Sequence, residues 1–339
     1  MATISPELWL KPTSAGLYCE PGRFHVDPSE PVEHAVITHG HADHAHAGHD
    51  HVLATPETAA IMAVRYGKDH TAQIQTAPYR QPTRIGDVTV TLLPAGHIFG
   101  SAQVMMEYAG ARAIVSGDFK RRRDPTCAPF EPMQCDLFIT EATFGLPVFR
   151  HPSDAHEIGR LLESIALYPE RAHLVGVYAL GKCQRLMCLL RESGYAQPIY
   201  LHGALRALTD LYVSLGVDVG PTASIEGLKP EQLKGALVLC PPAALADRWT
   251  RRLPDPVRAM ASGWMQVRAR ARQQGAELPL TISDHADWDE LLQTVDDIQP
   301  GEVWVTHGRE EGLVHALLKR GVKARALHLA GREENEGES

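Results

Sequence analysis

Short apolar runs that end abruptly at polar residues recur along the first half of the chain. The runs at 35–38, 88–93, 113–116 and 137–140 are rich in β-branched and aromatic residues, which favours strands over helices. In each case a histidine or an acidic residue follows soon after the run. Since polar side chains held at strand ends by a rigid sheet are typical of a reactive scaffold, the pattern places the candidate chemistry at these strand ends.

A different pattern begins near residue 150, where helix-like and strand-like segments alternate. Amphipathic spacing predicts helices over 153–167 and 183–190, and continuous apolar runs predict strands at 174–180 and 236–240. This βαβα order is typical of a small parallel sheet.

The end of the chain returns to the first pattern, with strand-like runs at 278–283 and 302–306 that each lead into a histidine. A strand is also expected near 254–260. The simplest interpretation is one domain interrupted by an inserted domain. The expected segments are 1–149 and 256–332 for the two parts of the first domain, 150–255 for the inserted domain, and 333–339 for an acidic disordered tail.

Composition narrows the class of protein. The chain has 339 residues, 44% of them hydrophobic and 22% charged, which is typical of a soluble globular protein. It contains neither a run of about 18 apolar residues nor a secretory leader, so we expect a cytoplasmic location and no membrane partner. The six cysteines form no CxxC pair and fit a reducing compartment.

The net charge of −8 at first argues against a polyanionic partner. Four of the acidic residues, however, lie in the terminal run at 333–338, and two bound divalent cations would reverse the local field of a site built from carboxylates. A basic run, Lys120 to Arg123, also lies next to a candidate metal ligand. Charge alone therefore does not exclude nucleic acid.

The segment 38–44 carries the main chemical signal, because it packs three histidines and an aspartate into six residues after a predicted strand. Such side chains are costly to bury without partners, so packing does not explain them. Alternate residues of an extended loop point the same way. His39 and His41 can therefore converge on one metal ion, while Asp43 and His44 reach a second.

Three further strand-end residues complete two metal sites. His97 follows a Pro-Ala-Gly segment, Asp118 follows Ser-Gly, and His307 follows Val-Thr. With the first motif they supply seven ligands, one of them a bridging carboxylate. Imidazole and carboxylate ligands without thiolate suit two divalent ions, Zn²⁺ first and Mn²⁺ as the alternative.

These motifs resemble, in order and spacing, those of the metallo-β-lactamase superfamily. Residues 140–145 are similar to the acidic motif that precedes the inserted domain of its β-CASP nuclease branch, and residues 282–287 to the histidine motif that follows it. Residues 178–185 resemble the Ala-Leu-Gly-Lys segment that opens a helix of that insertion. The resemblance implies an α/β fold: a metallo-β-lactamase αββα sandwich with an inserted small parallel-sheet α/β domain of the β-CASP kind.

The resemblance also assigns roles within the site. Glu141 and His285 would be a paired carboxylate and imidazole near the scissile phosphate. Asp27 would orient the ligand loop, although an aspartate before proline is equally typical of a turn. The implied metal sites are His39, His41 and His97 for one ion, Asp43, His44 and His307 for the other, and Asp118 as the bridge.

Two adjacent cations lower the pKa of a shared water and clamp both oxygens of an in-line displacement, which suits phosphodiesters. We therefore expect a hydroxide bridging the metals to attack phosphorus, with Asp43, Glu141 and His285 as the catalytic side chains. His285, oriented by Glu141, would bind the phosphate or protonate the leaving oxygen. Among the basic residues, Lys120, Arg121 and Arg122 would follow the nucleic-acid backbone. Lys182, at a helix N-terminus, would hold another phosphate.

Other function classes share parts of this pattern. A small-molecule hydrolase such as a thioesterase or lactonase would use the same metal ligands, but it would need neither Glu141, nor the insertion, nor the His285 motif. A non-catalytic binding subunit would lack ligands, and this sequence has all seven.

The choice between DNA and RNA depends on motifs that disagree. The whole chain resembles bacterial ligase-associated DNA exonucleases, which implies an exonuclease in DNA repair with a DNA ligase and a helicase as partners. His307 and Glu141 are instead typical of the RNA-processing relatives. Giving the whole chain more weight than single positions, we expect a DNA exonuclease, with an RNA-processing nuclease as the alternative.

Overall fold

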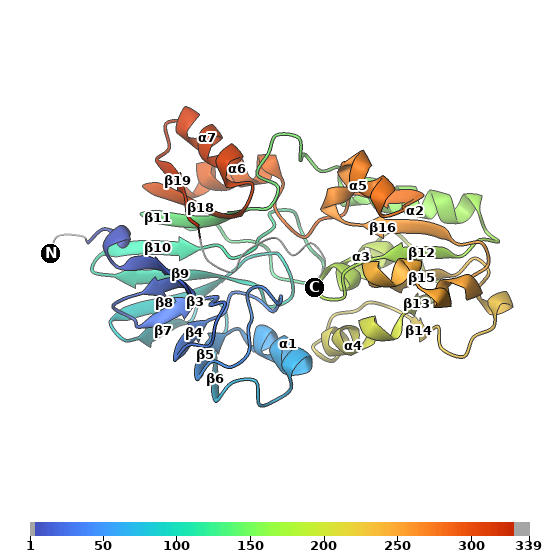
Figure 1. Cartoon of the computed structure of the whole chain (residues 1–339), viewed down its shortest axis with the longest axis horizontal. Coiled ribbons are helices and arrows are strands. Elements are labelled where there is room, and N and C mark those ends of the chain that lie inside the picture. Colours follow the sequence, from blue (N-terminus) through green and yellow to red (C-terminus); the bar gives the residue numbers. More distant parts are fainter. Residues whose placement is uncertain (1–3, 329–339) are drawn as a thin grey trace. The chain divides into compact units, whose positions relative to one another are not determined.

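The computed structural model describes residues 4–328, and its chain contacts divide into two compact units. The first unit contains the chain up to Arg150 and again from His285, and the second contains His151–Asp284. Figure 1 labels the elements of both. The acidic tail predicted at 333–339 lies outside the described residues.

The first unit begins with a six-stranded sheet whose strands follow one another in chain order. The first two pairings are antiparallel and the later three are parallel. Its strands are β1 (Leu10–Thr13), β2 (Gly16–Cys19), β3 (Phe24–Val26), β4 (His34–Val36), β5 (His51–Ala54) and β6 (Gln73–Thr76).

A seven-stranded sheet completes this unit and joins the two distant parts of the chain. Its order is β19-β18-β11-β10-β9-β8-β7, with β11 pairing in parallel with β10 on one side and β18 on the other. Its strands are β7 (Pro82–Ile85), β8 (Val88–Pro94), β9 (Ala102–Tyr108), β10 (Ala111–Val115), β11 (Leu137–Ala142), β18 (Glu302–Gly308) and β19 (Ala324–Ala326).

The two sheets pack face to face, because their alternating apolar side chains form one buried cluster that includes Phe24, Val90, Val104 and Trp304. Helix α1 (Pro56–Tyr66) covers the outer face of the first sheet. Figure 1 shows α6 (Trp288–Ile298) and α7 (Glu310–Lys319) over the outer face of the second, where their apolar sides pack on it. The layers therefore run helix, sheet, sheet, helices.

Local capping explains where two of these helices begin. Thr55 accepts a hydrogen bond from the backbone of Thr58, and Pro56 fits the first turn of α1. Asp287 and Glu290 form a reciprocal capping box at the start of α6. The backbone N–H of Trp288 donates to the carbonyl of Phe149 over 2.9 Å, so the first unit has its two chain segments side by side where the second unit departs and returns.

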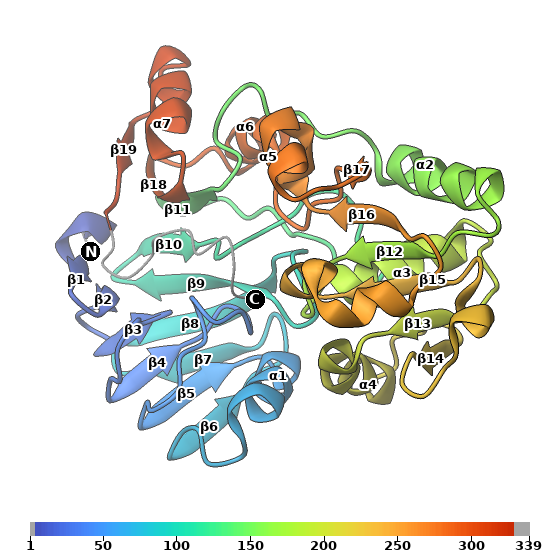
Figure 2. The same cartoon turned by 45° about the vertical axis from the view of Figure 1, so that its right-hand side comes forward.

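The second unit is built on a six-stranded sheet in which every pairing is parallel, in the order β14-β13-β15-β12-β16-β17. In Figure 2 the helical turns that follow β15 lie in front of this sheet and α3 lies behind it. Its strands are β12 (His173–Gly176), β13 (Ile199–Leu201), β14 (Thr222–Ser224), β15 (Leu237–Cys240), β16 (Val257–Ala261) and β17 (Leu278–Leu280).

Helices cover both faces of this sheet, as a wholly parallel sheet requires. The apolar sides of α2 (Asp154–Leu167) and α3 (Lys182–Glu192) pack on one face, together with residues beside α4 (Arg206–Ser214). The other face is covered by short helical turns: η4 (Pro242–Ala246), η5 (Arg248–Arg252), η6 (Gly263–Gln266) and α5 (Arg268–Gln273). Two further turns are η2 (Gly203–Leu205) and η3 (Pro230–Leu233), and η1 (Pro6–Leu8) opens the first unit.

The mixed α/β class is as predicted, but the predicted end of the inserted segment at 255 differs from the structure. Strands β16 and β17, which were assigned to the second part of the first domain, pair with β12 and with each other, and the second unit extends to Asp284. A strand buried in a parallel sheet and a strand of a mixed sheet both read as short apolar runs, so the pattern alone does not assign such a strand to its sheet.

Within residues 4–328, the structure has no helix that is both long and apolar enough to span a lipid bilayer.

Candidate metal centre

Asp27 holds the loop after β4, which carries His39, His41, Asp43 and His44, through hydrogen bonds to two of its residues. Both oxygens of this buried carboxylate are used: Oδ1 accepts from the backbone N–H of Thr38 over 2.7 Å, and Oδ2 accepts from the Thr38 hydroxyl over 2.6 Å and from His44 Nδ1 over 2.7 Å. Asp27 itself has a φ of 45°, an uncommon backbone conformation for a non-glycine residue. Its contacts set the direction of His44, whose Nε2 is left to face the cluster.

One group of donor atoms comes from three histidines and an aspartate. His41 Nδ1 lies 3.2 Å from His39 Nε2 and 3.0 Å from His97 Nε2, and Asp118 Oδ2 lies 3.4 Å from His39 Nε2. Ligand nitrogens at about 2.0–2.1 Å from a tetrahedral ion are separated by roughly 3.3 Å, so these separations fit one ion. His97 is held in place because its backbone N–H donates to the hydroxyl of Ser101 over 3.1 Å.

A second group lies beside the first and consists of Asp43, His44 and His307. Asp118 Oδ2 is 3.5 Å from His44 Nε2 as well as 3.4 Å from His39 Nε2, so one oxygen faces both groups. His307, the residue before the end of β18, has a φ of 61°, in the left-handed region. The structure thus brings together all seven residues that the sequence nominates as ligands, from four separate strand ends.

Glycine makes one of these approaches possible. Gly117 precedes Asp118, has a φ of 56°, and lies so close to Thr38 that a Cβ on it would stand 2.8 Å from the Thr38 Cβ. Any other residue would be strained there and would push the two ligand loops apart.

The donor atoms fit a divalent metal by a further criterion. His44 Nε2, Asp118 Oδ1 and His307 Nδ1 are buried, and none of them has a hydrogen-bond partner among the described residues. A buried polar atom without a partner costs roughly 1–3 kcal/mol, and three of them in one cluster are explained by coordination to metal. The structure therefore contains a His/Asp cluster that could bind divalent ions, and its donor set is nitrogen and oxygen without sulfur.

Electrostatics within the cluster keep its carboxylates ionised. Burial opposes the charged form of Asp118, but the imidazoles around it, His44 first and then His285, hold the pKa of Asp118 well below its usual range. Burial likewise disfavours a charged His44, but the carboxylates of Asp118 and Asp43 outweigh it and raise the pKa of His44 to about 9. Burial lowers the pKa of His307, which favours the neutral imidazole that a metal requires.

A carboxylate–imidazole pair lies against this cluster. His285 Nδ1 is 2.9 Å from Glu141 Oε2, and the rings of His285 and His97 have centroids 4.6 Å apart. Glu141 is buried, and its other contacts are the backbone N–H of Phe119 at 2.7 Å and the hydroxyl of Thr143 at 2.6 Å. The pair therefore fixes the direction of the His285 ring through its Nδ1 atom.

The sequence did not identify the supporting contacts of Thr143 and Phe119. Thr143 lies in the quoted segment 140–145 and Phe119 directly follows Asp118, but a backbone N–H carries no residue-type signal and threonine is common at strand ends. The register shift between β11 and β18 at Thr140 and Ala142 is also invisible in the sequence, although it lies beside Glu141 and His307.

The predicted basic strip is occupied by internal contacts. Lys120 is buried, and its Nζ lies 3.4 Å from the carbonyl oxygen of His285. Arg121 pairs with Asp297, and Arg122 pairs with the N-cap residue Asp287 of α6. The expectation that these three residues follow a nucleic-acid backbone is therefore not supported, because their charges hold α6 and the segment before it.

Lys182 is similarly engaged within the second unit. Its Nζ lies 3.1 Å from Asp284 Oδ1 and 4.6 Å from the centre of the Tyr178 ring, and the side chain is 8% exposed. One turn later, Arg185 is fully buried and pairs with Asp154 over 2.6 Å. A lysine held in this way is a poor candidate for an open phosphate cradle, so that expectation is also revised.

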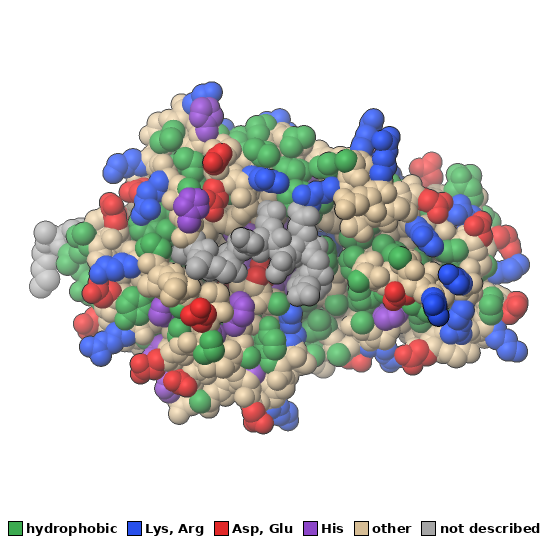
Figure 3. All heavy atoms as spheres, in the orientation of Figure 1, with side chains coloured by type: hydrophobic (Ala, Val, Ile, Leu, Met, Phe, Trp, Pro, Cys, Tyr) green, Lys and Arg blue, Asp and Glu red, His purple; other side chains and the backbone are tan. Residues whose placement is uncertain are grey.

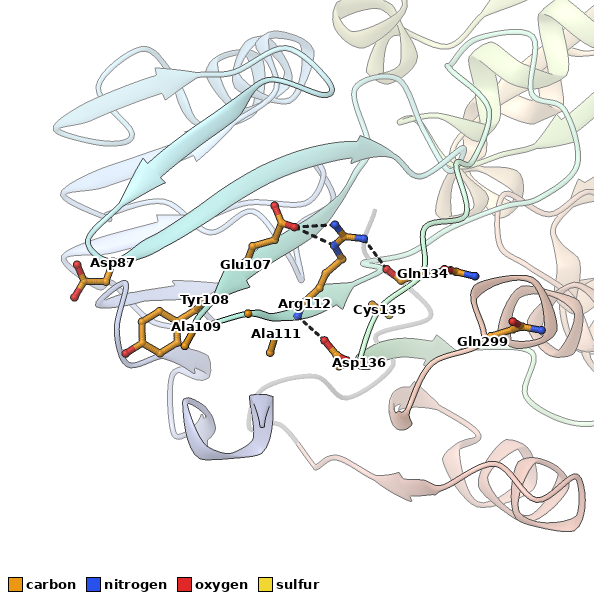
Figure 4. Close-up of a pocket in the computed structure, with 11 residues that line it drawn as sticks. Asp87, Glu107, Tyr108, Ala109, Ala111, Arg112, Gln134, Cys135, Asp136 and Gln299 are labelled. Atoms are coloured by element: carbon orange, nitrogen blue, oxygen red, sulfur yellow. Dashed lines mark hydrogen bonds and ion pairs between the residues drawn. The ribbon is translucent and has the colours of Figure 1, made fainter. Parts of the chain in front are cut away.

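A hollow elsewhere on the first unit, about 630 Å³, offers little chemistry (Figure 4). Its arginine, Arg112, donates twice to Glu107 and once to the carbonyl oxygen of Gln134, and its backbone N–H donates to Asp136. The arginine is thus satisfied within the wall, and none of the residues nominated from the sequence lies there.

Comparisons with known proteins agree with the motifs. No family model matches the chain. A protein of Opitutus terrae named as a probable DNA ligase is 32% identical over 94% of the chain and 31% of its own length. Subunit 3 of the cleavage and polyadenylation specificity factor of Dictyostelium discoideum is 34% identical over 38% of the chain and 17% of its own length. The endoribonuclease ysh1 of Aspergillus fumigatus is 30% identical over 37% of the chain and 15% of its own length.

The chain thus spans less than a third of the length of these relatives. A solved structure of an Enterococcus faecalis protein of unknown function has a similar fold, with a TM-score of 0.58, 14% identity, and coverage of 88% of this chain and 80% of the other. Together with the donor cluster, these relatives confirm the resemblance that the motifs indicate: the chain is related to the metallo-β-lactamase proteins of the β-CASP nuclease type.

Proposed function

We propose that this chain is a metal-dependent nuclease that hydrolyses phosphodiester bonds of DNA. The observation that carries the proposal is the Glu141–His285 pair beside a seven-residue cluster of imidazole and carboxylate donors. A hydrolase of small acyl substrates would have no need for this pair.

His39, His41 and His97 would hold one divalent ion and Asp43, His44 and His307 the other, with Asp118 shared. When bound, two such ions lower the pKa of water and stabilise charge on the attacking and leaving oxygens. Zn²⁺ is the proposed metal and Mn²⁺ the alternative, since both accept nitrogen and oxygen ligands.

The protein's own contribution to proton transfer is made by His285. Glu141 orients the ring through its 2.9 Å contact with Nδ1. Nε2 then binds a phosphate oxygen or donates a proton to the leaving oxygen. Because Glu141 is itself fixed by Phe119 and Thr143, the imidazole is preorganised before substrate arrives.

DNA is the proposed substrate because the relative that matches 94% of the chain is named as a probable DNA ligase. We accordingly propose an exonuclease of DNA repair that acts alongside a DNA ligase and a helicase, with the parallel-sheet unit as its inserted β-CASP-like domain. RNA processing is the second candidate, favoured by the endoribonuclease names of relatives that match about a third of the chain.

Matched end-labelled single-stranded DNA, duplex DNA and RNA, digested over time with Zn²⁺ or Mn²⁺, test the proposal. We expect a ladder or mononucleotide product from DNA, and none after His41→Ala or Asp118→Asn, which should also lose bound metal. His285→Ala should keep its metal and cleave slowly. Cleavage of RNA alone would select the second candidate, and cleavage of no nucleic acid by metal-loaded protein would reject the nuclease.

A further inference from the structure

Arginine is unevenly distributed in this acidic chain. The 25 residues from 248 to 272 contain seven arginines and one acidic residue, Asp255, in a chain whose net charge is −8. Asp255 is itself paired with Arg171 over 3.1 Å.

The fold gathers six of these arginines on one layer of the second unit. Arg248, Arg251 and Arg252 belong to η5, which follows the carboxyl end of β15, and the remaining three belong to α5, which follows β16. Parallel strands have their carboxyl ends at the same edge, and open α/β sheets bind ligands outside that edge. The six form the arginine face: Arg248, Arg251, Arg252, Arg268, Arg270 and Arg272.

This layer has an apolar inner side and a cationic outer side. Leu253 and Ala271 are buried in the hydrophobic cluster over the sheet, whereas Arg248, Arg251, Arg268 and Arg272 are exposed. None of these four arginines forms an ion pair with a carboxylate among the residues that the structure describes. Figure 3 shows Lys and Arg side chains standing out over α5.

Aromatic rings lie among these charges. The Arg270 guanidinium stacks 3.9 Å from the centre of the half-buried Trp264 ring. Trp249 lines a pocket of about 230 Å³ with His202, Ile225 and Arg252, and its ring centroid is 5.3 Å from that of His202. Sites for drug-sized ligands measure roughly 300–1,000 Å³, so this pocket suits a single planar ring system. One carboxylate, that of Glu226, also lines it.

We propose that the arginine face, with Trp249 and Trp264, binds single-stranded nucleic acid. Arginine pairs with phosphate through two parallel hydrogen bonds, and unstacked bases pack on aromatic rings; proteins that bind single strands combine the two. In a duplex the bases stack on one another and cannot enter the Trp249 pocket. The proposal rests on the proposed function, and it adds where the strand binds and in which form.

The test measures fluorescence anisotropy with labelled 20-mers in a single-stranded phosphorothioate DNA, a 2′-O-methyl RNA and a duplex form. Two triple variants are R248Q/R251Q/R252Q and R268Q/R270Q/R272Q. The matched control is R84Q/K319Q/K323Q, which removes the same charge from exposed positions of the first unit.

Each variant of the arginine face should bind single strands roughly tenfold more weakly or worse at about 0.1 M salt, and should reduce the slope of log K against log salt by about 2, or about 0.7 per lost phosphate contact. Trp249→Ala should lose roughly fivefold to hundredfold, and Trp249→Phe should lose much less because it keeps a ring. The control should change binding less than twofold.

Three results would overturn the proposal. The first is that both triple variants bind single strands as tightly as the control does, and the second is that the protein binds duplex as tightly as single strands and Trp249→Ala has no effect. The third is that polyglutamate displaces the labelled strand as effectively as unlabelled single-stranded DNA. Digestion of natural oligonucleotides by the same proteins distinguishes the failure of the proposed nuclease activity from the failure of the proposed binding surface. If the wild type cleaves DNA and the triple variants bind normally, only the arginine face is wrong. If the wild type neither cleaves nor binds any of the probes, both proposals fail.

Discussion

Two basic regions of this molecule differ in whether their charges are paired within the protein. Lys120, Arg121 and Arg122 form an obvious basic run, yet one is buried and the other two are paired with carboxylates of α6. The arginines of the arginine face lie in two separate short helices, η5 and α5, and form no single basic run in the sequence, yet most of their side chains are exposed. The difference teaches that charge density along a chain does not measure charge available to a ligand, because neighbouring elements can neutralise it.

The largest expected effect comes from Lys120. Lys120→Ala removes a buried ammonium and its methylene stem from beside the His285 carbonyl, and should cost about 2–4 kcal/mol of unfolding free energy. Urea unfolding of the metal-loaded protein measures this. Lys120→Met keeps most of the volume and should lie between wild type and Ala; no loss in either variant would contradict the internal role.

Arg122 should have the next largest effect. Arg122→Gln leaves the buried Asp287 carboxylate without its cation at the N-cap of α6, and should cost about 1–3 kcal/mol. The double variant R122Q/D287N should recover part of the loss, because the uncompensated charge is then gone. Additive losses in that thermodynamic cycle would show that the pair is not coupled.

Arg121 should matter less, since its partner Asp297 is partly exposed. Arg121→Gln should cost at most about 1 kcal/mol, reduced further by salt. The hydrogen bond from Arg121 lowers the pKa of Asp297, so the pair stabilises the fold above the unfolded pKa, near 4, and loses its effect as pH falls through the lowered folded value. The difference between the free energies of unfolding at pH 7 and pH 2.5 should therefore be smaller in Arg121→Gln than in the wild type.

The smallest effect on stability is expected at the arginine face. R268Q and R272Q should each change the unfolding free energy by no more than about 0.5 kcal/mol, since surface changes away from paired charges are usually within that limit. R270Q should cost about 0.5–1 kcal/mol, because it removes the stacking on Trp264. The same three changes are the ones expected to weaken strand binding. A loss of several kcal/mol would mean that this region too is structural, and the contrast between the two regions would disappear.

The sequence could predict much of the candidate metal centre and little of its surroundings. His39, His41, His97, Asp118 and His307 were identified because such side chains have few structural uses directly after strands. Their convergence involves both packed sheets, because His39 and His41 follow β4 of the first sheet while the other three lie at the ends of β8, β10 and β18 of the second.

Apart from the Glu141–His285 pair, which the family resemblance implied, pairing between distant residues could not be predicted. Lys120 and Lys182 were read as open cations, because nothing in their own segments shows the carbonyl of His285 or the carboxylate of Asp284 that engages them. The end of the inserted segment was misplaced for the same reason: β16 and β17 are assigned by their partners and not by their own residues.

The hydrogen bond between Phe149 and Trp288 has a consequence for the order of folding. It closes a loop of about 140 residues. The entropic free-energy cost of closing a loop grows by only about 0.6 kcal/mol per doubling of its length, so the length of this inserted segment lowers the stability of the fold only a little. The delay is kinetic, because β18 pairs with β11 across this span and contacts so far apart form late. His285 and His307 therefore join the residues of the first half only when that excursion has closed, and the site matures last.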